Sequence, residues 1–122
     1  MKASKLYEAV LGILGEEEYS SEDFTHLRFR AINQGLSLCL SSYNTILVSE
    51  GKEPIESFPL VVNDASKILL PDNFALEVLA YFVAAFLCSD HDRDKANVLS
   101  SMAYRGLKKY SKANFCDIKN HY

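Results

Sequence analysis

A chain of 122 residues with a formal net charge of −3 is long enough for one domain with a buried core. Apolar residues make up 48% of it and charged residues 24%, so composition alone gives no reason to expect nucleic-acid binding. The charge is polarised, since residues 1–92 carry 14 acids and 6 bases whereas residues 93–122 carry 2 acids and 7 bases. This split suits head-to-tail stacking on copies or on a charged partner, or it reflects acids and bases on different solvated faces.

Cysteine usage and hydropathy predict a soluble, cytoplasmic protein. Cys39, Cys88 and Cys116 are odd in number and widely spaced, which argues against a disulfide framework. The N-terminal stretch "MKASKLYEAVLGILGEEE" lacks the pattern of a secretory signal. The longest apolar run, residues 74–88, would span about 22 Å as a helix, less than the roughly 30 Å of a bilayer core.

The first half of the chain predicts two helices and a long connection. Apolar periodicity predicts a helix over residues 4–14 that Gly15 ends, and a second helix capped by Ser20 or Ser21 that continues to about Ser42. Residues 43–71 contain all three prolines and the short apolar runs 46–48, 60–62 and 68–70, which predict extended pieces or small strands. Connections of this length are often functional or ordered by a partner.

Two further helices are predicted in the second half. The third begins at Asp72, a plausible cap, and runs to about Ser89; being apolar almost all round, it needs cover on every side, either as a central helix or from a second copy. The fourth runs from about Asp92 to Ser111, followed by a loosely held tail. Its predicted inner face consists of Ala96, Leu99, Met102, Ala103, Leu107 and Tyr110. The fold class is therefore mainly α: a four-helix bundle-like single domain, residues 1–122, with a long irregular or short-β segment between helices 2 and 3.

The stretch "SDHDRD", residues 89–94, has the acids of a calcium loop or another metal site. A calcium-binding loop would next need glycine and later glutamate, where this chain has Lys95 and Ser101. Zinc would need more His or Cys ligands nearby. A turn explains the pattern better: Asp90 or Asp92 caps the fourth helix and Asp94 favours its N-terminal dipole.

Other chemistry-bearing residues lack a recognisable arrangement. The three cysteines with His26, His91 or His121 could form a nucleophile–base pair, but two of these cysteines lie within apolar helices, and no nucleotide, protease or hydrolase motif is present. We therefore expect no enzymatic activity, no metal and no cofactor. The stretch "YRGLKKYSK" could contact phosphate, but bases near a helix C-terminus also complement the helix dipole, which we favour.

The stretch "ILLPDNFALEVLAYFVAAFLCSDHDRDKANVLSSMAYRGLKKY" resembles small head–tail connector (adaptor or neck) proteins of tailed bacteriophages and prophages. An extended segment ends in "LLPD", a very apolar helix follows, and an acidic turn leads into a closing helix with regularly placed alanine and tyrosine. "RAINQGLSLCLSSYNTIL", a helix that leads into an irregular arm, also fits. The resemblance covers about two-thirds of the chain, and its motifs are compositional rather than catalytic.

The resemblance implies a helical protomer that assembles into a homo-oligomeric ring below the portal and docks the tail or a stopper protein. It places the protein in the virion, and in the host bacterial cytoplasm during assembly, with at most weak non-specific DNA contact and no membrane. Candidate partner or subunit contacts are Ile46, Leu47, Val48, Phe58, Leu60, Val61 and Val62. Candidates for facing DNA or an acidic partner are Arg105, Lys108, Lys109 and Lys112.

Two other classes of function remain open from the sequence. The first is a small cytosolic helical module for protein–protein interaction or regulation. The second is a metal-dependent enzyme built on Asp90, His91, Asp92 and Asp94.

Overall fold

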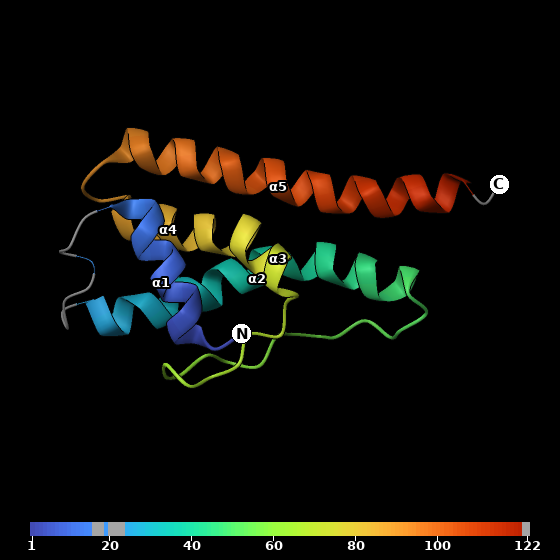
Figure 1. The fold of residues 1–122 in the computed structure, drawn as a ribbon, viewed down its shortest axis with the longest axis horizontal. Helices are drawn as coiled ribbons and strands as arrows, with labels where there is room; N and C mark the ends of the chain where they lie inside the picture. Colours follow the sequence, from blue (N-terminus) through green and yellow to red (C-terminus); the bar gives the residue numbers. More distant parts are fainter. Residues whose placement is uncertain (16–18, 20–23, 121–122) are drawn as a thin grey trace.

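The computed structural model describes residues 1–15, 19 and 24–120, with the side chains of Thr25 and residues 111–120 left aside. Its described part is mainly helical, as predicted (Figure 1). The helices are α1 (Ala3–Leu14), α2 (Thr25–Ser49), a continuous helix made of α3 (Asp72–Phe74), the π-helical η3 (Ala75–Leu79) and α4 (Ala80–Cys88), and finally α5 (Arg93–Asn120).

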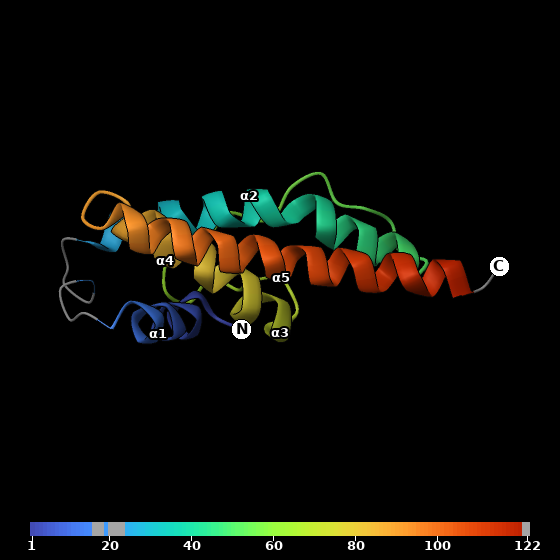
Figure 2. The ribbon, with the colours of Figure 1, turned by 90° about the horizontal axis from the view of Figure 1, so that it is seen from above.

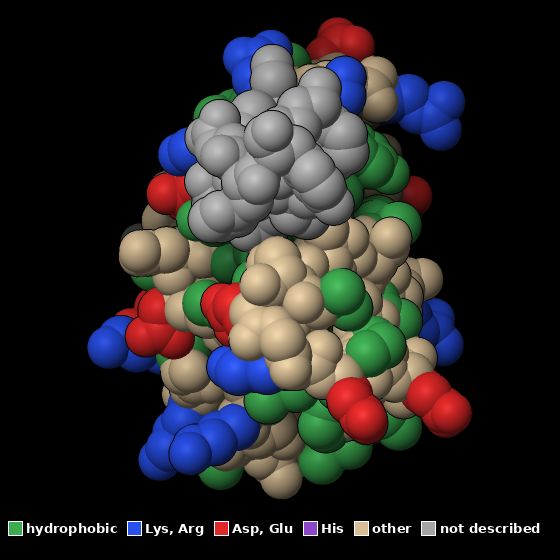
Figure 3. Space-filling view, turned by 90° about the vertical axis from the view of Figure 1, so that its right-hand side faces the viewer, with side chains coloured by type: hydrophobic (Ala, Val, Ile, Leu, Met, Phe, Trp, Pro, Cys, Tyr) green, Lys and Arg blue, Asp and Glu red, His purple; other side chains and the backbone are tan. Residues whose placement is uncertain are grey.

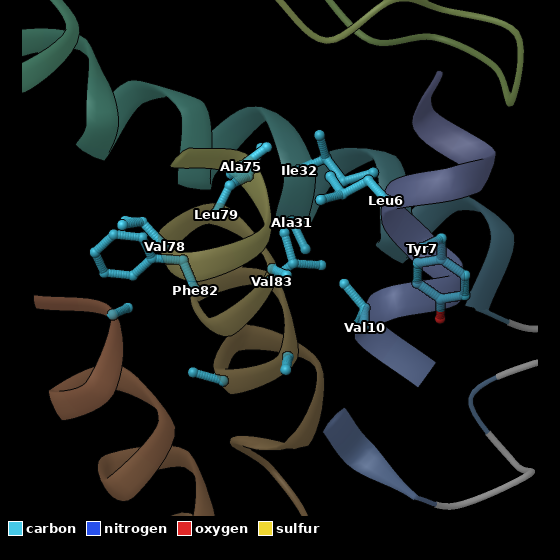
Figure 4. Close-up of a cluster of buried hydrophobic side chains, with 14 of the residues drawn as sticks. Leu6, Tyr7, Val10, Ala31, Ile32, Ala75, Val78, Leu79, Phe82 and Val83 are labelled. Carbon is cyan, nitrogen blue, oxygen red and sulfur yellow. The ribbon is translucent and has the colours of Figure 1, made fainter. Parts of the chain in front are cut away.

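The helix over residues 72–88 is the centre of the domain. It runs antiparallel to both α2 and α5, which flank it, while α1 crosses beside it (Figures 1 and 2). Because three other helices of the same chain cover it, its apolar character is explained within one protomer. Figure 4 shows Leu6 and Val10 of α1 and Ile32 of α2 directed toward the side chains of this central helix. Its buried residues include Phe74, Val78, Leu79, Phe82 and Val83.

Two glycines let the outer helices approach the central one closely. A Cβ on Gly35 of α2 would lie 2.7 Å from Leu79 Cδ1, and one on Gly106 of α5 would lie 3.0 Å from Val78 Cγ2. The Cβ on Gly106 would also lie 3.2 Å from the carbonyl oxygen of Glu77, in the π-helical turn. Both helices are therefore packed so closely against this turn that an added side chain would require the neighbouring atoms to shift.

Helix α2 ends later than predicted. It continues through Ser49, so residues 46–48 are helical and the prediction that they are extended was wrong. The helix then stops in a Schellman motif, in which Gly51 has φ of 77° and the N–H groups of Gly51 and Lys52 donate to Val48 and Leu47. Packing accounts for the extra turns, because the side chain of Leu47 is buried.

The other helix ends agree with the prediction in part. Gly15 ends α1 with φ of 69°, as expected, and its N–H donates to the carbonyl of Leu11. Asp72 lies in the first turn of α3 and makes no capping hydrogen bond, so its prediction as a cap was wrong. Helix α5 continues to Asn120 instead of ending near Ser111. The predicted caps Ser20 and Ser21 lie outside the described residues.

The connection from residue 50 to residue 71 is irregular. It passes back along α2, turns at residues 62–66 and returns to the start of α3 (Figure 1). Among the described residues it contains no strand, and its β-structure is limited to one isolated antiparallel bridge between Lys2 and Lys67. The expected small strands are therefore absent here, whereas the long irregular segment is confirmed.

Candidate interaction surface

Two asparagines of α2 hold the first part of this connection, residues 53–62, which we call the arm. The Asn33 side chain donates to the carbonyl of Val61 (3.0 Å) and accepts from its N–H (2.9 Å). Asn44 makes the same pair of hydrogen bonds with Ile55, both at 2.9 Å. Each amide thus satisfies both backbone groups of one arm residue, as a neighbouring strand would do. The arm is fixed to α2 at both ends.

The inward-facing side chains of the arm recur at every third residue: Ile55 and Phe58 are partly buried and Val61 is buried, whereas the residues between them are exposed. Val61 is 2% exposed and belongs to the core, whereas its neighbours Leu60 and Val62 are 75% and 67% exposed. The ring of Phe58 packs against that of Tyr43 of α2, with 5.4 Å between centroids. The arm therefore presents two large apolar side chains to solvent from a backbone that α2 holds in place.

The returning part of the connection is bound to the N-terminal residues. Ile68 N–H donates to the carbonyl of Met1 and Ala3 N–H donates to that of Ser66, both at 2.8 Å. Ser66 also closes the turn, because its hydroxyl accepts from the N–H groups of Val62 and Asn63 at 3.2 Å. These bonds connect the arm, the turn and the start of α1 into one layer along one side of the bundle.

The seven predicted contact residues divide into two groups. Val48, Leu60 and Val62 are exposed and available to a partner. Leu47 and Val61 are buried within the chain, and Ile46 and Phe58 are partly buried against the core. In the end-on view of Figure 3, hydrophobic side chains gather at the lower edge of the molecule, on the side along which the connection runs, with basic side chains beside them.

The predicted basic residues do not form one free cluster. Lys109 is ion-paired with Glu77, with Nζ and Oε2 3.5 Å apart. Arg105 and Lys108 are exposed on α5. The side chain of Lys112 lies outside the described part of the structure. A DNA-facing or acid-facing role thus has Arg105 and Lys108 available.

The "SDHDRD" stretch forms a capped turn between α4 and α5, as predicted. Asp92 Oδ1 accepts from the N–H of Lys95 at 3.0 Å, and the Asp92 carbonyl accepts from Ala96. The carbonyl of Cys88 accepts from the N–H groups of His91 and Asp92. Asp92 is thus the cap of α5. Among the residues that the structure describes, no group of three or more His, Cys, Asp or Glu side chains could hold a metal ion.

The cysteines within the core are poorly placed for nucleophilic chemistry. Cys39 is fully buried, and desolvation raises the pKa of its thiol to about 12, which disfavours the thiolate at neutral pH. Cys88 is buried and its Sγ lies 3.8 Å from the carbonyl of Ala85. His26 and His91 are exposed, while Cys116 and His121 lie outside the part whose side chains are described.

Sequence reasoning missed Asn33 and Asn44. They are eleven residues apart, which places them on one face of a helix about three turns apart. That spacing was the available signal, but two helical asparagines are ordinarily solvent-exposed, and their partners are distant in sequence.

No protein-family model, curated protein or solved structure matches this chain. None of the described helices has the length and apolarity needed to cross a bilayer.

Proposed function

We propose that this chain is a structural subunit of a bacteriophage or prophage head–tail connector, which joins the portal to the tail or a stopper protein by forming a ring. The observation that carries the proposal is the arm, which α2 holds through Asn33 and Asn44 while Leu60 and Val62 remain exposed. Such a subunit functions through its contacts, in the virion and in the host cytoplasm during assembly.

A fixed apolar arm supports an assembly role for an energetic reason. Each large apolar side chain that moves from solvent into an interface contributes about 1.5–3 kcal/mol. The arm backbone is already ordered by its bonds to α2, so association would lose less conformational entropy than it would with a free loop. Leu60 and Val62 are therefore suited to subunit contact.

The charge distribution supports a ring in which unlike faces meet. Residues 1–92 are strongly acidic and residues 93–122 are basic, and the exposed bases Arg105 and Lys108 lie on α5. A heterologous interface joins one surface of a subunit to a different surface of the next, which such polarity favours. With Lys109 already paired to Glu77, the remaining bases favour at most weak contact with DNA.

Oligomeric state with and without the portal tests the proposal. We expect sedimentation velocity and electron microscopy to show a ring, either alone or on a bacteriophage portal protein. The double substitution Leu60→Asp with Val62→Asp should abolish the ring, whereas Val98→Asp, at a remote exposed valine of α5, should not. A chain that stays monomeric with the portal present, or a double variant that still forms rings, would overturn the proposal. A chain that stays monomeric with the portal present but binds a cytosolic protein would instead favour the alternative function, a small helical module for protein–protein interaction or regulation.

A further inference from the structure

A hollow of about 550 Å³ separates the two extended legs of the connection. The first leg is residues 59–62, of which Pro59 and Leu60 form one wall of the hollow; the second leg, residues 66–70, forms the other wall, with Met1 beside it. The legs meet at the turn where the Ser66 hydroxyl accepts from Val62 N–H, and the hollow lies beyond that meeting point. The hollow is therefore bordered by extended backbone on both sides.

The first leg directs unpaired backbone groups toward the second leg. Successive residues of extended chain direct their N–H and C=O groups to opposite edges. Both groups of Val61 are bonded to Asn33, so those of Leu60 and Val62 belong to the other edge. The bond from Val62 N–H to Ser66 Oγ shows that this edge faces the second leg. Among the described residues, nothing bonds the backbone groups of Leu60.

The second leg has a matching unpaired edge. Ser66 and Ile68 bond to the N-terminal residues on the outer side, and they flank the bridge between Lys2 and Lys67. Lys2 and Lys67 form a non-hydrogen-bonded pair in this antiparallel bridge, so the N–H and C=O groups of Lys67 are directed away from Lys2. They face the hollow, and they too lack a hydrogen-bond partner within the described chain.

The outer surface of this layer adds chemistry to the backbone edges. Val61, Ile68 and Leu70 are buried beneath the layer, whereas Leu60, Val62 and Leu69 are exposed. The side chains of Lys2 and Lys67 are directly opposite each other, and like charges in that position repel. An anionic group beside the two lysines would relieve the repulsion, so apolar and anionic groups complement this surface.

We propose that the hollow is a docking slot for an extended peptide segment of a partner protein, with alternating apolar and acidic side chains. Its backbone inserts between the legs and hydrogen-bonds to Leu60 on one side and Lys67 on the other. Its apolar side chains cover Leu60 and Leu69, and a carboxylate contacts the lysine pair. This is strand addition, in which backbone bonds supply affinity and alternate side chains supply selectivity. The inference does not rest on ring formation.

Peptide binding by the whole chain tests the slot. The probe is a fluorescein-labelled nine-residue peptide of alternating glutamate and valine, measured by anisotropy and by amide shifts in ¹⁵N spectra. Three peptides serve as comparisons: one with lysine in place of glutamate, one with the same composition in two blocks, and one N-methylated at alternate backbone positions. Lys67→Glu is the test variant; Lys108→Glu and Val98→Ser are controls at exposed positions on α5.

We expect the alternating acidic peptide to bind with a Kd on the order of 10–100 µM and to shift the amides of Leu60, Lys67 and Leu69. N-methylation and Lys67→Glu should each weaken binding roughly tenfold, the control variants should not, and Lys67→Glu should gain affinity for the lysine peptide. Unchanged amides at saturating peptide, or equal binding of the N-methylated peptide, would overturn the proposal. Self-association that Lys67→Glu removes would also overturn it, because a second copy would then occupy the slot.

Discussion

Replacing Asn33 by alanine tests whether the clamp stabilises the arm. The substitution removes two hydrogen bonds to Val61, of 3.0 and 2.9 Å, each worth about 1 kcal/mol net. Alanine has a higher helix propensity than asparagine, which stabilises α2 by about 0.6 kcal/mol and offsets part of this loss. We therefore expect the free energy of unfolding to fall by about 1.5 kcal/mol. It should fall by up to about 3 kcal/mol if the Val61 backbone stays buried without partners.

Asn44→Ala is the matched comparison, because Asn44 makes the same two bonds at a more exposed place. Its partner Ile55 is partly buried, whereas Val61 is 2% exposed, so water can replace the lost bonds more easily at Ile55. We expect a loss of about 0.5–1 kcal/mol there. Asn97→Ala, at an exposed position of α5, should have no destabilising effect.

Urea denaturation and amide hydrogen exchange measure these effects. Exchange at Val61 should accelerate in Asn33→Ala, and exchange within α4 should follow the change in global stability alone. The reasoning fails if Asn33→Ala unfolds at the same urea concentration as the parent. It also fails if Asn44→Ala is the more destabilising of the two, since burial would then not set the magnitude.

The remaining predictions concern helix packing, capping and thiol chemistry. Gly106→Ala should destabilise the protein by about 1–3 kcal/mol because of crowding against the central helix, whereas Gly12→Ala, with no atom near its Cβ, should stabilise it by about 0.5–1 kcal/mol; thermal unfolding separates them. Asp92→Ala should lower the free energy of unfolding by about 1 kcal/mol through loss of the cap, and Asp90→Ala should leave it unchanged, as measured by urea titration. With its thiol pKa raised to about 12, Cys39 should resist alkylation at pH 8 until the protein unfolds, which peptide mass spectrometry detects; rapid labelling of the native protein would contradict this burial.

The helices were predictable because apolar periodicity and glycine stops are local signals. Gly15 ends α1 and Asp92 caps α5, as their sequence contexts indicate. The end of α2 was not predictable in this way, since the partly β-branched run at residues 46–48, with Ile46 and Val48, favours extended structure by propensity alone. Burial of Leu47 reverses that preference, and it depends on packing that no local window contains.

The clamps could not be predicted, because each depends on a match between two distant segments. Eleven residues of helix separate Asn33 from Asn44 and advance about 16 Å, whereas the six steps from Ile55 to Val61 can span about 20 Å when extended. Bends at residues 56–57 accommodate the difference. Both Ile55 and Val61 direct their backbone groups to α2, and between them only Phe58 is partly buried while the other residues are exposed. Because Val61 is bonded to Asn33 and its side chain lies in the core, the neighbouring Leu60 is left facing solvent, which is what makes the arm a surface for a partner.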